Sequence, residues 1–234
     1  MNSVLDEAFI LQSKPYRESS AIVRLFSQQH GLVSAVIRGV YGDSRKARQL
    51  RSAIQTGNRI ELQWTGRSDL KTVTSCDLLS SAVFASPRHF VCLCYVNELL
   101  LHFLQAEQPA QRLYVAHQYL VQAVAIDSSL ERVLRLYEYE LLDELGCSVD
   151  FLWDAGNDCP VTEGINYMLE PQTGICVNKS GHGLMLQAEH LHKLAERDLA
   201  SDEMLAMAKQ INRRMIDYQL AGRPLKAREL YRQL

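Results

Sequence analysis

Long apolar runs are scarce in this chain of 234 residues. The longest one, FVCLCYVNELLLHFL, is interrupted by Asn97 and Glu98 and falls short of a membrane span. The start, MNSVLDE, is acidic and lacks a basic segment followed by an apolar one, so we expect no signal peptide. These absences predict a cytoplasmic protein without a membrane partner.

Motifs for catalysis are missing as well. The sequence contains no Walker-type phosphate loop, no Gly-x-Ser-x-Gly elbow and no His-Glu-x-x-His pair. GVYGDSRK at 39–46 offers glycines and cations, but its spacing is not that of a phosphate loop. We therefore predict no cofactor and no enzymatic activity.

Metal-binding patterns are weak. The six cysteines form no Cys-x-x-Cys pair, and we expect them to be reduced. Cys147, Cys159 and Cys176 lie in or beside an irregular stretch where a metal would help the fold, but their spacing is loose. His190 and His192 are two positions apart, which on a helix turns them about 200° away from each other. The sequence predicts no metal site.

The net charge of −2 conceals a strong asymmetry along the chain. Residues 1–80 carry eleven Lys or Arg and seven Asp or Glu, whereas residues 81–208 carry seven and eighteen. Residues 209–234 carry seven and two. Two basic ends flanking an acidic middle suggest a polyanionic partner for the basic parts. The carboxylates of Glu138, Glu140, Asp143 and Glu144 are interpreted as a solvated acidic helix face rather than an acid/base pair.

Alternating apolar and polar residues predict five short strands in the first eighty residues. The predicted strands are 7–13, 20–27, 31–38, 59–65 and 70–80. The second and third form a hairpin around a Gln-Gln-His-Gly turn. Five such strands favour a small OB-type barrel, and an SH3-like barrel is the alternative. The stretch 44–56 does not alternate and is interpreted as a loop with a helical turn.

After residue 80 the apolar period becomes helical. The predicted helices are 88–107, 110–126, 128–146, 187–198, 201–221 and a C-terminal one in 224–234. Gly, Asp, Asn, Pro and Cys interrupt the pattern between them and predict a small irregular β insert at about 147–186. The fold class is thus α+β, with a nucleic-acid-binding barrel domain at 1–80 and a helical domain at 81–234.

The basic segment RGVYGDSRKARQLR at 38–51 is the strongest functional signal. OB barrels bind single strands when cations follow the phosphates and aromatic rings stack on the bases. Tyr41 and Trp64 are candidate stacking rings, and packing in the core is the alternative for Trp64. The predicted DNA-binding residues are Arg38, Arg45, Lys46, Arg48, Arg51, Arg67 and Lys71.

Three stretches together resemble the RecO family of recombination-mediator proteins. They are AFILQSKPYRESSAIVRLFSQQHGLVSAVIRGV, LRLYEYELLDELG and GRPLKARELYRQL. The resemblance implies an OB barrel, a helical domain, binding of single- and double-stranded DNA, annealing of complementary strands and no covalent catalysis. It also implies partners, because RecO proteins act with RecR to load RecA onto DNA coated by the single-strand-binding protein SSB. A nucleoid-associated location in the cytoplasm would follow.

The resemblance implies that the helical domain binds the acidic C-terminal tail of SSB. A receptor for a C-terminal Phe and its carboxylate needs an apolar pocket with a nearby cation. The candidate residues on the predicted helix 128–146 are Arg132, Leu134, Arg135 and Tyr139. The alternative is that these arginines pair with Glu131 or Glu138 on their own helix.

The insert departs from the family pattern. Many relatives carry two Cys-x-x-Cys pairs where this chain has Asp154, Asn157, Cys176 and Lys179. Only one thiol is left and Lys179 would repel a cation, so the resemblance also speaks against zinc. Two alternatives to a recombination mediator stay open: a metal-dependent DNA-processing enzyme that uses the acidic middle, and a protein-interaction adaptor without direct DNA binding.

Overall fold

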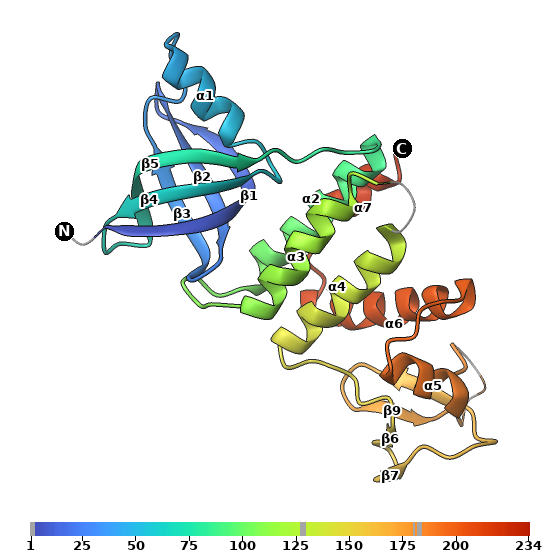
Figure 1. The fold of residues 1–234 in the computed structure, drawn as a ribbon. Helices are drawn as coiled ribbons and strands as arrows, with labels where there is room; N and C mark the ends of the chain where they lie inside the picture. Colours follow the sequence, from blue (N-terminus) through green and yellow to red (C-terminus); the bar gives the residue numbers. More distant parts are fainter. Residues whose placement is uncertain (1–2, 127–129, 180, 182–183) are drawn as a thin grey trace. The chain divides into compact units, whose positions relative to one another are not determined.

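A computed structural model describes residues 3–126, 130–179, 181 and 184–234 (Figure 1). The chain divides into two compact units, Met1–Leu130 with Leu225–Leu234, and Glu131–Pro224. The proposed domain boundary at residue 80 stays a prediction. The first unit contains the barrel, the helices that directly follow it and the C-terminal helix, which comes after the second unit in the sequence. Among the described helices, none combines the length and the apolarity needed to cross a bilayer.

The first part of the chain forms a closed barrel, as the alternation predicted. Its strands are β1 (Val4–Tyr16), β2 (Ser20–Ser27), β3 (Gly31–Ile37), β4 (Arg59–Thr65) and β5 (Leu70–Ser80). They pair in the order β1-β2-β3-β5-β4, and β1 pairs with β4 to close the barrel. β3 and β5 run parallel while the other neighbours are antiparallel. The predicted OB-type barrel is confirmed.

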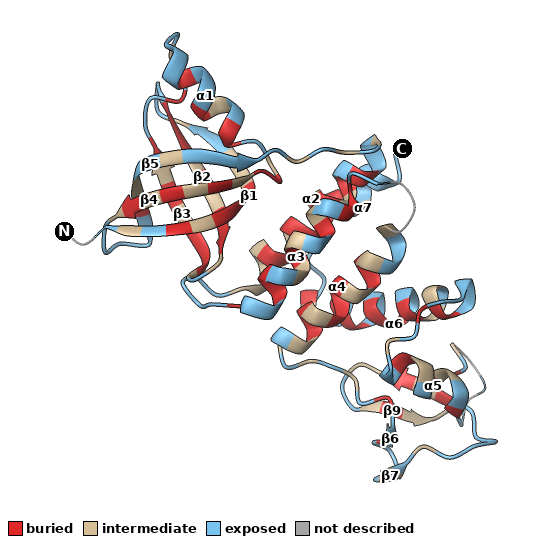
Figure 2. Ribbon diagram, viewed as in Figure 1, coloured by how far each residue is buried: buried red, intermediate tan, exposed pale blue. Residues whose placement is uncertain are grey.

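Strand alternation builds the core of the barrel (Figure 2). On β2, Ala21, Val23 and Leu25 are fully buried inside, whereas Ile22 and Arg24 are only half-buried. Trp64 lies in the same core with 3% of its surface exposed. The interpretation of Trp64 as a stacking ring was therefore wrong, and its alternative, core packing, is what the structure has.

The β2–β3 turn depends on a glycine. Gly31 has a φ of +64°, a left-handed backbone conformation that costs free energy for residues with a Cβ. A Cβ at this position would lie 1.9 Å from the carbonyl oxygen of Gln108. The residues after α2 (Pro87–Phe103) therefore pass directly against the turn, where Glu107 N donates to Leu32 O at 3.0 Å.

Between β3 and β4 the chain forms helix α1 (Arg45–Ala53), which is longer than the single helical turn predicted there. Ser44 caps it, because its hydroxyl accepts a hydrogen bond from Ala47 N at 3.1 Å. Ala47, Leu50 and Ala53 are buried along one side of the helix. Their spacing of three residues was the helical signal within the basic stretch.

Helices α2 and α3 (Gln111–Ala123) belong to the same unit as the barrel. Phe9 and Phe26, which point out of the barrel, pack against Tyr114 and His117 of α3 with ring centroids 4.9–5.7 Å apart. Asn97 of α2 donates a buried hydrogen bond to Leu11 O at 3.1 Å. This aromatic contact and the buried hydrogen bond hold the two helices on the outer face of β1 and β2.

Helix α7 (Lys226–Tyr231) completes the first unit. The carboxylate of Glu98 on α2 accepts hydrogen bonds from Lys226 N and Ala227 N, at 2.9 and 3.0 Å. A carboxylate at the first turn of a helix satisfies N–H groups that have no partner within the helix. The guanidinium of Arg228 also lies 5.5 Å from the ring centroid of Tyr95 on α2.

The second unit contains helices and a small sheet. It contains α4 (Leu130–Glu144), α5 (Ala188–Ala195) and α6 (Asp202–Leu220), with α4 ending before Gly146 at a φ of +65°. The short strands are β6 (Trp153–Asp154), β7 (Cys159–Pro160), β8 (Tyr167–Glu170) and β9 (Gly174–Val177), in the order β7-β6-β9-β8. The predicted β insert is present; the first two residues of the predicted helix 128–146 lie outside the described residues.

Candidate nucleic-acid interface

Several exposed Arg and Lys side chains lie at one end of the barrel. Arg38 directly follows β3 and is exposed. Tyr41 N donates to Ser19 O at 3.1 Å, so the loop after β3 lies beside the β1–β2 turn. Helix α1 begins a few residues later and presents Arg45 and Lys46 to solvent. We call this surface, made of Arg38, Tyr41, Arg45, Lys46 and Arg48, the basic end of the barrel.

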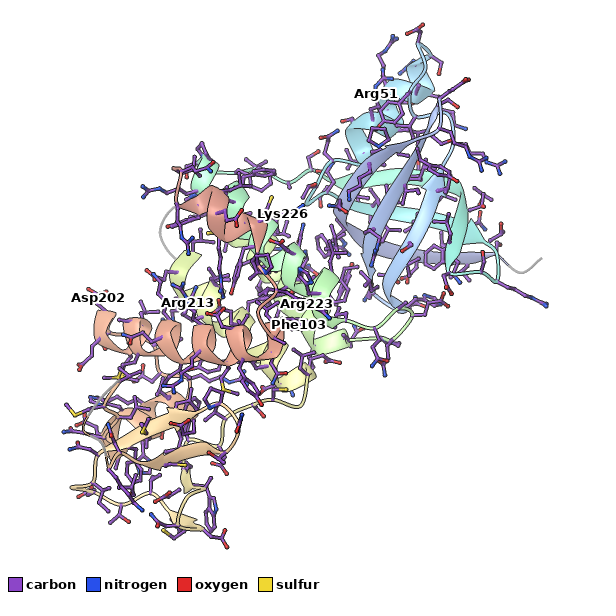
Figure 3. The ribbon with its side chains drawn as sticks, turned by 180° about the vertical axis from the view of Figure 1, so that it is seen from behind. Arg51, Phe103, Asp202, Arg213, Arg223 and Lys226 are labelled. Atoms are coloured by element: carbon purple, nitrogen blue, oxygen red, sulfur yellow. The ribbon has the colours of Figure 1, made fainter. Side chains whose placement is uncertain are left out.

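The cations of α1 differ in what their guanidinium groups bind. Arg48 is exposed and makes one hydrogen bond, to Asp43 O at 3.0 Å. Arg51 (labelled in Figure 3) is half-buried and donates to Val40 O at 3.0 Å and Gly42 O at 2.9 Å. These bonds brace the loop between β3 and α1. Arg51 therefore shapes the surface, while its guanidinium is already occupied by backbone carbonyls.

Two of the predicted residues lie away from the basic end. Lys71 pairs in register with Ala35, which faces the barrel interior, and only 6% of Lys71 is exposed. Its ammonium lies 2.5 Å from the carboxylate of Glu107, so the buried lysine is paired with an exposed glutamate. Arg67 is exposed in the β4–β5 turn beside the start of β1, at the opposite end of that strand from the β1–β2 turn. Their DNA-binding role stays a prediction, and their positions do not favour it.

Sequence reasoning missed Arg17 and Arg24. Arg17 lies in the β1–β2 turn at a φ of +54°, with its guanidinium 5.0 Å from the ring centroid of Tyr16. Arg24 points outward on β2, between Gln12 and Ser34 on the neighbouring strands. The alternation of β2 already placed Arg24 on the outer face, which was the available signal. The closeness of Arg17 to the basic end required the tertiary structure.

The basic end suits a flexible polyanion. Within the described ranges, no carboxylate pairs with Arg38, Arg45 or Lys46. Cations of this kind neutralise phosphates without reading a sequence. Tyr41 is 37% exposed and offers a ring to an unpaired base, and such stacking contributes about 1–3 kcal/mol per base.

The predicted tail-binding residues have a different environment. Arg135 is 6% exposed and its Nη1 lies 3.1 Å from Oε2 of Glu138. Glu138 also accepts a hydrogen bond from Asn212 of α6 at 3.2 Å. Leu134 and Tyr139 are buried as well, and only Arg132 is exposed. Pairing within the helix, the alternative for Arg135, is thus present, and its role in tail binding stays a prediction.

The acidic side of α4 is solvated only in part, because Glu144 is exposed whereas the other three carboxylates are buried or half-buried. The interpretation as a solvated face was therefore wrong for those three. Glu138 is 1% exposed and neutralises Arg135. Glu140 and Asp143 both bind Arg197, whose guanidinium lies 5.7 Å from the ring centroid of Tyr139. Burial raises the pKa of the Tyr139 hydroxyl well above its usual range, so this side chain stays uncharged.

Two of the four positions where many relatives carry cysteines, Asp154 and Asn157, are joined by hydrogen bonds. Asp154 is 1% exposed and accepts from Gly156 N at 3.0 Å, from Asn157 N at 3.3 Å and from Asn157 Nδ2 at 2.7 Å. In the part of the chain that is described, no three His, Cys, Asp or Glu side chains are grouped to hold a metal ion. The expectation of no zinc stays a prediction.

Fold and surface together define an α+β protein whose OB-type barrel carries a cationic, partly aromatic end. The model of the recombination protein O N-terminal region matches residues 1–82, and that of its C-terminal region matches residues 86–229. The chain belongs to the recombination protein O family.

Full-length relatives agree with this assignment. The DNA repair protein RecO of Nitrosococcus oceani is 31% identical, over 100% of this chain and 95% of the relative. RecO of Vibrio cholerae is also 31% identical, over 100% and 95%. RecO of Erwinia tasmaniensis is 33% identical, over 97% and 91%.

Proposed function

We propose that this chain is a DNA repair mediator that binds single- and double-stranded DNA, anneals complementary strands and, with RecR, helps RecA load onto SSB-coated DNA. The observation that carries the proposal is the basic end of the barrel, where exposed cations without carboxylate partners in the described chain surround an exposed tyrosine. Membership of a family whose relatives are named DNA repair proteins supports it.

The chemistry of the basic end fits strand annealing better than sequence recognition. Long cationic side chains of α1 follow phosphates of any sequence, and the strands keep their base edges free to pair. Neutralising both backbones at one surface also lowers the repulsion between two strands. Neither step requires a nucleotide or a metal ion.

A charge-matched pair of variants tests the DNA-binding site. The triple variant Arg45→Ala, Lys46→Ala, Arg48→Ala should weaken binding to all oligonucleotides and slow annealing. Each lost phosphate contact should flatten the log–log salt slope by about 0.7 for single strands. The control variant replaces Lys209, Arg213 and Arg214, three exposed cations of α6 (Arg213 is labelled in Figure 3), and should keep both activities.

Three results would oppose the proposal. Unchanged affinity and salt slope in the folded triple variant would remove α1 from the site. Absence of any salt-dependent DNA binding by the unaltered protein would favour the protein-interaction adaptor. Metal-dependent turnover of the oligonucleotides would favour the DNA-processing enzyme.

For the SSB tail we propose helix α4 as the binding site, with Arg132 as the exposed cation. Arg132→Glu should abolish binding of a labelled tail peptide in fluorescence anisotropy and leave annealing of bare DNA intact. Arg135→Glu should also abolish it. Because Arg135 neutralises buried Glu138, a melting curve must show whether that variant is folded. Wild-type affinity of Arg132→Glu for the peptide would place the site elsewhere.

A further inference from the structure

The second unit contains a pocket of about 180 Å³, and none of the predicted DNA-binding residues lines it. Its walls come from the second half of α4, the segment that follows α4, the end of α5 and one residue of α6. The main apolar lining residues are Tyr139, Leu142, Val149, Phe151, Leu152 and Leu194. An apolar cavity of about 150 Å³ is large enough for a benzene ring, so this pocket has room for one aromatic side chain.

Part of the pocket lining is buried and well packed. Leu142, Phe151 and Leu194 are at most 6% exposed. The rings of Tyr139 and Phe151 meet edge to face, with centroids 6.2 Å apart. Leu152, at 42% exposed, provides apolar surface toward solvent. A partner's side chain would therefore enter a preformed apolar site.

Arg197 is held at one wall by its ion pairs. Its backbone has a φ of +55°, which is unfavourable for a residue with a Cβ. Its guanidinium donates to the carboxylates of both Glu140 and Asp143. These two bonds stabilise the left-handed backbone of Arg197 and neutralise its charge. The only cation among the lining residues is thus already paired with carboxylates.

The remaining charge is negative. Asp150 is exposed beside the pocket and fixes the local backbone by accepting from Leu152 N at 3.0 Å. Residues 131–224 carry nine Lys or Arg against sixteen Asp or Glu. An acidic ligand would be repelled here, whereas a basic one would be attracted.

We propose that this pocket docks a basic segment of a partner protein, which inserts one aromatic side chain as an anchor. Charge complementarity identifies the partner as cationic, and the cavity volume identifies the anchor as ring-sized. The site differs in chemistry from a receptor for an acidic tail, and it does not depend on the DNA-binding proposal.

Labelled peptides test the pocket with the full chain. The probe is Lys-Arg-Phe-Arg-Lys with both ends capped, and fluorescence anisotropy measures its binding at low salt. Replacing its Phe by Ser should weaken binding at least about tenfold, since aromatic anchors dominate such interfaces. Replacing its four cations by Glu should abolish binding. Equal binding of the Phe and Ser peptides, or tighter binding of the acidic one, would overturn the proposal.

Matched variants locate the binding. Ala195→Phe places a ring in the pocket and should lower the affinity for the Phe peptide at least about tenfold. Ala206→Phe adds the same ring at an exposed position of α6 outside the pocket and should have no effect. Asp150→Asn keeps the acceptor for Leu152 N, removes the charge and should weaken binding about threefold, unlike exposed Glu163→Gln. Wild-type affinity in folded Ala195→Phe would refute the pocket; if that variant does not fold, equal affinity in Asp150→Asn and Glu163→Gln would do so.

Discussion

The two compact units use arginine in opposite ways. In the first unit, Arg38 and Arg45 stand at the end of a barrel whose core is complete without them. In the second unit, Arg135 and Arg197 are bound by carboxylates of α4 and form part of the packing. The same residue type thus supplies an outward charge in one unit and an internal support in the other.

This difference shows that the number of cations does not identify a binding surface. The barrel contains arginines of both kinds, since Arg51 binds backbone carbonyls only a short distance from exposed Arg48. What distinguishes the two is whether the protein itself satisfies the guanidinium. An unsatisfied, solvated cation is available to a phosphate, whereas a satisfied one would have to give up its protein partners first.

The largest effect is expected where a buried ion pair is broken. Glu138→Ala should lower the free energy of unfolding by about 3–5 kcal/mol, because Arg135 would be left buried without a countercharge. Urea unfolding of the full chain measures it. The double replacement Arg135→Met, Glu138→Leu should recover much of the loss. A change below about 1 kcal/mol in Glu138→Ala would mean that Arg135 is not an internal support.

A buried histidine in the first unit should make stability depend on pH. Burial of His117 between Phe9 and Phe26 lowers its pKa from 6.5 to about 3. The folded protein therefore keeps it neutral, while the unfolded chain takes up a proton below pH 6.5. The contribution of neutral His117 to the free energy of unfolding is complete above pH 6.5. It falls by about 1.4 kcal/mol per pH unit as the pH drops from 6.5 toward 3.

The free energy of unfolding is measured at pH 7 and at pH 4.5 for the wild type and for His117→Gln. The difference between the two proteins in the loss from pH 7 to pH 4.5 isolates this contribution. At pH 4.5 the wild type should have lost about 2–3 kcal/mol more than the variant, since the substituted side chain does not titrate. Equal losses in both proteins would show that His117 is not held neutral by the fold. The carboxylates of the chain are common to both and cancel.

Arg51 should behave as an internal support within the barrel. Arg51→Ala removes the bonds to Val40 O and Gly42 O and should cost about 1–2 kcal/mol of unfolding free energy. Its melting temperature should fall while that of Arg48→Ala stays near wild type. Equal melting temperatures would place Arg51 with the solvated cations and sharpen the case for its direct contact with DNA.

The smallest change in stability belongs to the exposed cations. Arg45→Ala and Lys46→Ala should each alter the free energy of unfolding by no more than about 0.5 kcal/mol, because their side chains are solvated. Their oligonucleotide affinity should nevertheless fall, most clearly at low salt. A loss of stability comparable with that of Arg51→Ala would remove the distinction drawn within α1.

Several features followed from sequence patterns because they are local. Residue alternation predicted the five strands, and β2 was predicted with its observed bounds. Glycines marked the β2–β3 turn and the end of α4. The basic stretch around Arg45 was visible as composition. Each of these depends on neighbours within a few residues, which a sequence displays directly.

Other features depend on partners that are distant in the chain. The partner of Lys71 is Glu107, which lies 36 positions further along the chain, and buried Glu138 binds Asn212 of α6 as well as Arg135 on its own helix. Similarly, the pocket lined by Phe151 and the other second-unit residues has no sequence motif.

The sequence by itself determined the strand and helix pattern, the OB-type barrel and the likeness to recombination mediators. Only the tertiary structure decided which cations remain solvated, that Trp64 lies in the core, and that α4 faces an arginine from beyond the insert. The physical reason is that alternation and turn chemistry are local properties of the chain. Burial and ion pairing are properties of its packed interior, and they set which charges are left for a partner.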